Sequence, residues 1–294
     1  MSQVTFLERL QSGDILVADG ATGTNLQQRG LTMGKPGEVW VFERPQEIKR
    51  LHKNFIDAGS DIILTCTFGG TSIRLDGEGM GNRVVELNKR AVELAREAVE
   101  GSDVLVGGSM GPTGQMLKPL GTLEEDEALI AFTDQARALT EAGVDLLLLE
   151  THFDLGEAII AVKAARSVSV LPLVCSFSYD RGTRTMMGVS PSQMAAEISA
   201  LDVNVLGINC GRSLDDNLNA LKELRTVTDL PIWFKPNAGL PKVDDEGKTF
   251  YDVTPEEMGS RVSDWIAAGA SIVGGCCGSS PEHIHQIALA AKAK

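Results

Sequence analysis

Three of the five cysteines stand where they could hold a metal ion. Cys210 follows the apolar run 205–208, and the adjacent Cys276 and Cys277 follow the run 272–273. Adjacent cysteines do not readily form a disulfide, because consecutive Cα atoms are about 3.8 Å apart and a disulfide usually needs at least about 4.4 Å. Three thiolates with an exchangeable fourth position would instead make an open, catalytic type of Zn²⁺ site. The alternative is that three small side chains fill the core, but the glycines that flank them indicate room for a ligand.

Two carboxylates follow other apolar runs. Asp19 comes after the run 15–18, and Glu150 comes after the run 146–149. A deeply placed acid needs a cationic partner or a proton, and the ammonium group of a ligand would serve. The alternative is that both acids accept hydrogen bonds from neighbouring loops. The remaining cysteines, Cys66 and Cys175, have no cysteine nearby in the sequence, and we expect them in the core.

Several further groups lie at the ends of apolar runs. Gly20, Ala21 and Thr22 could offer backbone N–H groups to a carboxylate or phosphate, and Ser109 lies just beyond the run 104–107. Tight turns would explain the same glycines, and no GxGxxG or P-loop pattern accompanies them. His152 follows the strand that ends at Glu150 and could contact a substrate. We expect surface or helix-end positions for the other histidines, His52, His283 and His285.

The elements that must position these residues alternate regularly along the chain. Eight short apolar runs are strand candidates, at residues 15–18, 62–64, 104–107, 146–149, 173–176, 205–208, 232–234 and 272–273. Eight amphipathic segments lie between and after them, at 45–58, 82–100, 124–142, 154–167, 191–200, 214–228, 255–268 and from 281 onward. The phrases DAGSDIILT, EAGVDLLLLE and AAGASIVGG each place a glycine between a helix and the next strand, as a C-cap glycine would lie.

This alternation predicts one domain, a single (β/α)₈ TIM barrel spanning residues 1–294. Two open doubly wound domains are the alternative architecture. In a barrel the chemistry lies at the carboxyl ends of the strands, where the candidate residues above are found. Cys210 and the Cys276–Cys277 pair would then lie on two strands separated by one.

Composition excludes several classes of protein. The 294 residues include 27 Lys and Arg against 40 Asp and Glu, a net charge of −13, so a nucleic-acid partner is not expected. No apolar stretch is long enough to span a membrane, and Glu8 and Arg9 interrupt any signal-peptide core. We therefore expect a cytoplasmic protein with reduced thiols. The sequence does not predict the oligomeric state.

The motifs at the run ends resemble those of the homocysteine S-methyltransferase family. They occur in order as ADGATGT, TCTFGGT, GSMGPTG, LLLETHFD, GINCG, KPNAGLP and GGCCG, from about Asp19 to Gly278. The segments PNAGLP, GKTFY and TPEEM are most similar to the homocysteine-binding barrel of cobalamin-dependent methionine synthase.

The resemblance implies zinc-dependent transfer of a methyl group to the sulfur of homocysteine, with Cys210, Cys276 and Cys277 as metal ligands. It places the amino group of homocysteine near Asp19 and Glu150, with Ser109 among the substrate-binding residues. The carboxylate is expected at the backbone N–H groups of Gly20, Ala21 and Thr22. Asn237 is a candidate fourth zinc ligand, and a structural role in its loop is the alternative.

The methyl donor is less well defined by the sequence. A cobalamin signature D-x-H-x-x-G is absent, so we expect either a methyl-corrinoid carried by a separate protein or a small donor such as betaine or S-methylmethionine. Betaine-type members carry a tyrosine where this chain has Thr151, which favours the corrinoid. Aromatic side chains that could hold a cationic donor are Trp40, Phe68, Phe153, Phe177, Tyr179 and Trp233.

Two other functions fit the same residues. The chain could be a non-catalytic, thiol-binding subunit of a corrinoid methyltransfer complex, which a zinc-bound but inert protein with a co-purifying partner would indicate. It could also methylate another thiol or a selenol, which competition against homocysteine would reveal.

Overall fold

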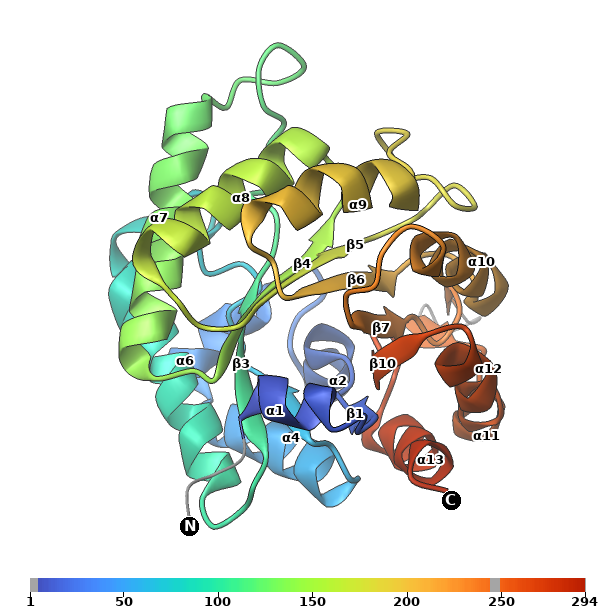
Figure 1. The fold of residues 1–294 in the computed structure, drawn as a ribbon. Coiled ribbons are helices and arrows are strands. Elements are labelled where there is room, and N and C mark those ends of the chain that lie inside the picture. Colours follow the sequence, from blue (N-terminus) through green and yellow to red (C-terminus); the bar gives the residue numbers. More distant parts are fainter. Residues whose placement is uncertain (1–4, 244–248, 294) are drawn as a thin grey trace.

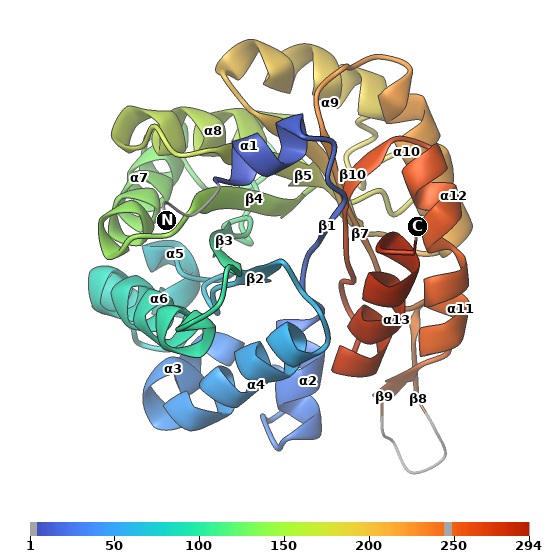
Figure 2. The same cartoon turned by 60° about the horizontal axis from the view of Figure 1, so that its bottom comes forward.

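Parallel strands form the centre of the molecule, and helices surround them (Figures 1 and 2). The computed structural model describes residues 5–243 and 249–293. Within these residues the eight-stranded sheet has the order β1-β10-β7-β6-β5-β4-β3-β2, and a parallel bridge between Ala18 and Ile62 joins its two ends. The predicted single (β/α)₈ barrel is confirmed, and the alternative of two open doubly wound domains is wrong.

All eight barrel strands overlap the predicted apolar runs. Several continue for two or three residues into the segments predicted to lie at the mouth. The strands are β1 (Leu16–Val17), β2 (Ile62–Leu64), β3 (Leu105–Met110), β4 (Leu146–His152), β5 (Leu173–Phe177), β6 (Val205–Cys210), β7 (Ile232–Pro236) and β10 (Ala270–Val273).

An antiparallel hairpin that the sequence analysis does not predict follows β7. It consists of β8 (Pro241–Val243) and β9 (Thr249–Tyr251), in which Lys242 pairs with Phe250. Gly247 and Lys248 of the GKTFY segment lie outside the described residues. The hairpin brings Tyr251 to the carboxyl end of the barrel.

Helices occupy the predicted amphipathic segments, although the segment 255–268 forms two helices that meet at Arg261. Four short helices near the amino terminus were not predicted. The helices are α1 (Phe6–Gln11), α2 (Thr22–Gln28), α3 (Trp40–Glu43), α4 (Pro45–Asp57), α5 (Ser72–Asp76), α6 (Val84–Val99), α7 (Glu125–Ala142), α8 (Leu155–Val168), α9 (Pro191–Ile198), α10 (Leu214–Arg225), α11 (Pro255–Ser260), α12 (Val262–Ala267) and α13 (Pro281–Ala291), with 3₁₀ turns η1 (Gly37–Val39), η2 (Gly81–Arg83) and η3 (Ser199–Leu201).

The repeated phrases end helices as predicted. Gly143 is the C-cap of α7 and has φ 88°, a left-handed conformation that glycine adopts without steric cost. The corresponding Gly59 and Gly269 both have φ 104°. These turns return the chain from each helix directly into β2, β4 and β10.

The barrel interior is apolar, and α1 closes its amino-terminal end. Phe6 of α1 packs with side chains from the beginnings of the strands, including Leu16, Leu105 and Leu146. Arg9 of the same helix donates to Asp61 Oδ1 at 2.8 Å, just before β2. A second apolar layer fills the space between the strands and the surrounding helices. Across residues 5–243 and 249–293, no helix combines the length and apolar character that a membrane crossing requires.

Candidate metal and substrate site

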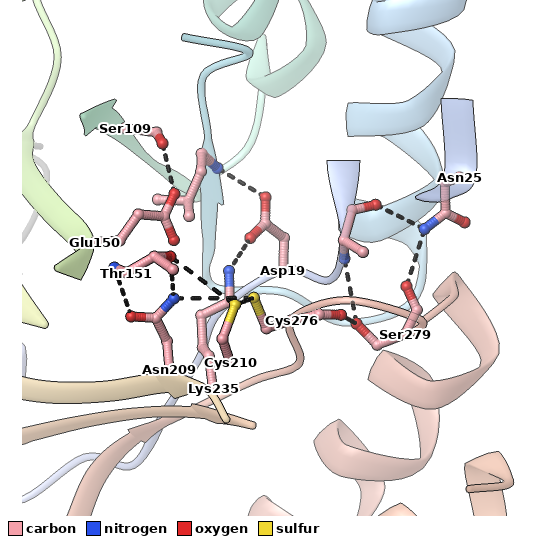
Figure 3. A network of polar contacts seen from close by, with 12 residues as sticks. Asp19, Asn25, Ser109, Glu150, Thr151, Asn209, Cys210, Lys235, Cys276 and Ser279 are labelled. Carbon is pink, nitrogen blue, oxygen red and sulfur yellow. Dashed lines mark hydrogen bonds and ion pairs between the residues drawn. The ribbon is translucent and has the colours of Figure 1, made fainter. Parts of the chain in front are cut away.

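Three thiols come together at the carboxyl end of the barrel. Cys210 ends β6, and Cys276 and Cys277 follow β10, with β7 between these two strands. The three Sγ atoms lie within 4.8 Å of one another, and those of Cys210 and Cys276 are 3.0 Å apart (Figure 3). The cluster could hold a metal ion.

The backbone at Cys210 is in an unusual conformation. Its φ of 60° lies in the left-handed region, which non-glycine residues adopt rarely and mainly where the surroundings enforce it. Asn217 Nδ2 donates to the Cys210 carbonyl at 2.7 Å, and the backbone N–H of Asn237 donates to the same oxygen at 3.2 Å. This arrangement fixes the direction of the Cys210 side chain.

The sequence analysis expects the flanking glycines to leave space for a ligand. In the structure, other parts of the chain fill the space beside these glycines. A Cβ at Gly211 would lie 2.3 Å from Asn217 Oδ1, and one at Gly278 would lie 2.2 Å from the Tyr251 ring. A Cβ at Gly275 would lie 2.4 Å from Ser279 Oγ. These glycines are required because the chain itself packs tightly behind and beside the cysteines.

Asp19 is paired with a lysine of the chain. Lys235, in β7, lies with its Nζ 2.7 Å from Asp19 Oδ1, and the backbone N–H of Leu64 donates to Oδ2 at 2.8 Å (Figure 3). Both charged side chains are almost fully buried. Lys235 therefore supplies the cationic partner that the buried Asp19 carboxylate needs.

Glu150 lies on the same side of the mouth, at the end of β4. Ser109 Oγ donates to its Oε1 at 2.5 Å. Burial raises the pKa of Glu150 to about 7, and the nearby Lys235 and the hydrogen bond from Ser109 oppose this shift only in part. Burial alone would lower the pKa of Lys235, but the carboxylates of Asp19 and Glu150 outweigh it and raise that pKa. Lys235 thus provides a fixed positive charge.

Asn209 joins the ends of three strands beside the thiols. Its Oδ1 accepts from the Thr151 backbone N–H at 2.9 Å and from Ser176 Oγ at 2.7 Å. Its Nδ2 donates to Thr151 Oγ1 at 2.7 Å and lies 3.8 Å from Cys276 Sγ. Thr151, like Cys210, has a positive φ, of 63°. The sequence analysis assigns no role to Asn209 and uses Thr151 only to choose between methyl donors.

The loop after β1 is tied to the segment that follows the cysteines. The Ala21 N–H donates to the Ser279 carbonyl at 3.2 Å, and Asn25 Nδ2 donates to the same carbonyl at 2.9 Å. The Ala21 N–H is therefore already used by the protein. Gly20 and Thr22 flank it, and both line the adjoining cavity.

Asn237 lies next to the cluster without lining that cavity. Its Nδ2 donates to the Gly211 carbonyl at 2.8 Å. Its Oδ1 is buried and has no hydrogen-bond partner among the described residues. Buried polar atoms are rarely left unpaired in proteins, so this oxygen could accept a hydrogen bond or bind a cation.

A cavity of about 480 Å³ contains most of the candidate residues. Its wall includes Gly20, Ala21, Thr22, Ser109, Glu150, Cys210, Lys235, Cys276 and Cys277. Of the aromatic residues proposed from the sequence, only Phe68 lines it, whereas Phe177, Tyr179 and Trp233 are fully buried elsewhere. Tyr251, which was not proposed, is a second lining aromatic.

The histidines and the other cysteines take different places. His152 is fully buried, with its ring centroid 6.1 Å from that of Phe132 and 6.3 Å from that of Phe177, and it does not line the cavity. His52 is buried in α4, so the predicted surface or helix-end position is wrong, while His283 caps the start of α13. Cys175 is in the core as expected; Cys66 is buried but also touches the cavity.

The fold and site together define a (β/α)₈ barrel protein with a thiol cluster able to hold a metal ion at its mouth. The model of the family described as homocysteine S-methyltransferase matches residues 16–291. The chain belongs to this homocysteine S-methyltransferase family.

Similar proteins are found among both characterised sequences and solved structures. Methionine synthases of Mycobacterium leprae and Mycobacterium tuberculosis are 30% and 31% identical over 94% of this chain, which spans only 24% of their length. The metallated form of the homocysteine methyltransferase MmuM from Escherichia coli is 26% identical with a TM-score of 0.81, covering 97% of this chain and 98% of that one.

Proposed function

We propose that the chain transfers a methyl group to the thiolate of homocysteine to give methionine, with a zinc ion held by Cys210, Cys276 and Cys277. The observation that carries this proposal is the gathering of three thiols within 4.8 Å of one another in a barrel of this family. The adjoining cavity offers the buried charges that recognition of a free amino acid requires.

The donor set fits zinc. Tetrahedral coordination with Zn–S bonds of about 2.3 Å separates the sulfur atoms by about 3.8 Å. These thiols lie within 4.8 Å of one another, and the Cys210–Cys276 pair, at 3.0 Å, would move slightly apart to bind the ion. Thiolates also favour zinc over magnesium or calcium. The unpaired Oδ1 of Asn237 supports the proposal of this residue as the fourth ligand in the absence of substrate.

The chemistry needs a substrate sulfur that is ionised near neutral pH. A free thiol with a pKa near 8.5 is mostly protonated there, and a bound zinc ion would supply the Lewis acidity that favours the thiolate. Lys235 contributes a buried positive charge close to the negative sulfur cluster. Asn209 restrains Cys276 through its contact at 3.8 Å.

The remaining lining residues would orient homocysteine. Glu150 is the acid best placed for its ammonium group, because Asp19 already has Lys235 as its partner. Ser109 holds the Glu150 carboxyl in position. For the substrate carboxylate we retain the N–H groups of Gly20 and Thr22, since that of Ala21 is bonded to Ser279.

The proposal has two versions that differ in the methyl donor. In the version favoured by Thr151 in the sequence, a separate protein delivers a methyl-corrinoid. In the other, a small donor enters the cavity, whose wall also includes the charged side chains of Glu38 and Arg74. Both versions use the same acceptor sulfur and the same thiol cluster.

The metal proposal is tested by zinc content and homocysteine binding. We expect about one zinc per wild-type chain and a loss of zinc and of homocysteine binding in Cys210→Ser and Cys277→Ser. Cys175→Ser is the matched control, because this buried thiol lies in β5 away from the cluster. Full zinc content and full activity in either cluster variant would refute the proposal.

The donor is tested by following the absorption of methylcobalamin with zinc-loaded protein and homocysteine, against mixtures that lack either one. Loss of the methyl–cobalt band with formation of methionine, only in the complete mixture, supports the corrinoid version. If the band persists and a small donor is turned over, the result supports the small-donor version.

A further inference from the structure

The proposed site would bring sulfur atoms of the same chemistry side by side. Homocysteine would add its own sulfur to those of Cys210, Cys276 and Cys277. A thiolate is a nucleophile whether it belongs to the substrate or to the protein, so an electrophilic methyl group that reaches the cluster could react with a cysteine. The product would be a thioether, and the protein would lose a thiolate ligand. The contacts of the cysteines therefore bear on where the methyl group goes.

Asn209 is held in one orientation beside the cluster. Its buried Oδ1 accepts from the backbone N–H of Thr151 at 2.9 Å. Because a backbone N–H only donates, the atom that it meets must be the oxygen of the amide. The two hydrogens of Nδ2 are then directed to Thr151 Oγ1 at 2.7 Å and to Cys276 Sγ at 3.8 Å (Figure 3). Asn209 therefore donates one hydrogen to a hydroxyl group and the other to a sulfur of the cluster.

Thr151 extends this arrangement to a second sulfur. Its hydroxyl oxygen accepts from Asn209, which leaves the single hydroxyl hydrogen to donate elsewhere. Cys210 Sγ lies 3.9 Å from the hydroxyl oxygen, and within residues 5–243 and 249–293 that hydrogen has no other acceptor. The Thr151 hydroxyl therefore donates to Cys210. Two of the three thiols are thus hydrogen-bonded, directly or through Thr151, by one asparagine.

The backbone of Thr151 adopts a conformation that these contacts enforce. Its φ of 63° is an outlier for a β-branched residue, and such conformations persist only where the surroundings hold them. The register between β4 and β5 shifts between Leu149 and His152. At this irregularity the Asn209 side chain accepts from the Thr151 N–H. The same amide that contacts Cys276 thus holds Thr151 in place at the cavity wall.

We propose that Asn209 and Thr151 are positioning residues whose hydrogen bonds lower the nucleophilicity of two cysteines, so that the methyl group is transferred to the acceptor sulfur and not to the protein. A hydrogen bond to an anionic sulfur stabilises its charge, and a less basic sulfur is also a weaker nucleophile. Both donors are used by Cys276 and Cys210, so the acceptor sulfur does not receive them. This inference rests on the proposed function, because it requires that the thiols hold zinc.

The reaction that these hydrogen bonds would suppress is a simple displacement. A lone pair of a cysteine sulfur forms a bond to the methyl carbon, the bond from that carbon to its leaving group breaks, and the electron pair of the broken bond departs with the leaving group. No oxidant or reductant takes part. Methyl iodide is a suitable probe, with iodide as the leaving group. It is too small to need a binding site for a donor, so it reports the reactivity of each sulfur.

The test treats the zinc-loaded full chain with limiting methyl iodide, without homocysteine, and measures methylation of each cysteine by mass spectrometry of fragmented peptides. Cys277 is the internal reference, because in the described part of the chain neither Asn209 nor Thr151 donates to it. Thr151→Val should raise methylation of Cys210 relative to Cys277 about three- to tenfold, as expected for loss of one hydrogen bond to a charged sulfur. Asn209→Leu should raise the ratio for Cys276 as well.

Two further variants distinguish the hydrogen bonds from the packing around them. Thr151→Ser keeps the hydroxyl group and should restore the wild-type ratio for Cys210. Ser176→Ala is the matched control, because Ser176 donates to the same Asn209 oxygen but contacts no sulfur of the cluster. Its ratios should stay close to those of wild type. Zinc content is measured for every variant, so that loss of the metal is not mistaken for a change in reactivity.

The outcomes separate this inference from the proposed function. A selective rise at Cys210 in Thr151→Val, with zinc retained and with recovery in Thr151→Ser, supports the inference even if Asn209→Leu fails to fold. Equal rises at all three cysteines would show that the substitution only loosens the cluster, and unchanged ratios would show that the hydrogen bonds do not control reactivity. Either result overturns the inference and leaves the proposed function standing. A wild-type chain that binds no zinc would refute both.

Discussion

The two ends of the barrel are built from the same strands but hold opposite kinds of side chain. At the amino-terminal end, Phe6 and the first residues of the strands form a continuous apolar cluster. At the carboxyl end, Asp19, Glu150 and Lys235 are buried together, and Cys210 adopts a backbone conformation that is rare outside glycine. The comparison shows that the apolar end stabilises the fold, whereas the polar end is held in an arrangement that would be unfavourable by itself.

The largest effect is expected from breaking the buried ion pair at the polar end. Lys235→Met leaves the Asp19 carboxylate buried without its partner, so the free energy of unfolding should fall by about 3–5 kcal/mol. Urea denaturation measures this change. The double variant Asp19→Asn, Lys235→Met removes both charges and should be clearly more stable than Lys235→Met. If the two variants were equally unstable, the loss of stability would come from altered packing of these side chains and not from the unpaired charge.

A cavity at the apolar end should reduce stability without affecting the site. Leu146 is fully buried at the start of β4, in the apolar cluster with Phe6, and Leu146→Ala should lower the free energy of unfolding by about 3 kcal/mol. Zinc content and homocysteine affinity should stay at wild-type values at a temperature where the variant is folded. Leu289→Ala, at a half-exposed position of α13, is the matched control. Loss of zinc in Leu146→Ala would contradict the separation of the two ends.

The buried histidines should make the fold sensitive to mild acid. Burial lowers the pKa of His152 to about 3 and that of His52 to about 4, so both stay neutral in the folded protein while the unfolded chain is protonated below about pH 6.5. Each should therefore cost about 2 kcal/mol of stability at pH 5 relative to pH 7. His152→Leu should have a flatter stability profile over this range. An identical profile would show that the pKa of His152 is the same in the folded and the unfolded protein.

The smallest effect is expected at Ser109, which holds Glu150 at the polar end. Ser109→Ala removes one hydrogen bond to the carboxyl group and should weaken homocysteine binding by about 1.5 kcal/mol, roughly tenfold. Because the Glu150 carboxyl group is buried, the free energy of unfolding should also fall by about 1 kcal/mol. A calorimetric titration gives the affinity, with Ser192→Ala, in α9 and outside this cavity, as control. Unchanged affinity would remove Ser109 and Glu150 from the acceptor site.

The barrel and the thiol cluster could be predicted because both depend on local patterns. Apolar runs separated by amphipathic segments define the strands, and a cysteine directly after a run must lie at the carboxyl end. Cys210 and Cys276 are 66 residues apart, but the strand count alone brings them to the same end of the barrel.

Other features depend on contacts that no local pattern specifies. Lys235 was recognised within the KPNAGLP motif, but its partner Asp19 is 216 residues away, and the sequence does not show which acid it faces. Tyr251 reaches the site only through the β8–β9 hairpin, and its packing on Gly278 is a tertiary contact. Helix α1, which closes the amino-terminal end, could have been predicted from one feature of the sequence. Thr5 and Glu8 have the spacing of a capping box, which the structure forms.

The contact between Ala21 and Ser279 has a consequence for the order of folding. It joins the loop after the first strand to the segment after the last one, and the two cysteines of that segment complete the thiol cluster. The three-thiol cluster therefore does not exist until the last strand has docked beside β7, and the same segment closes the barrel against the loop after the first strand. A metal ion bound by the proposed cluster would stabilise the closed barrel by mass action, so metal uptake during synthesis would report completion of the fold.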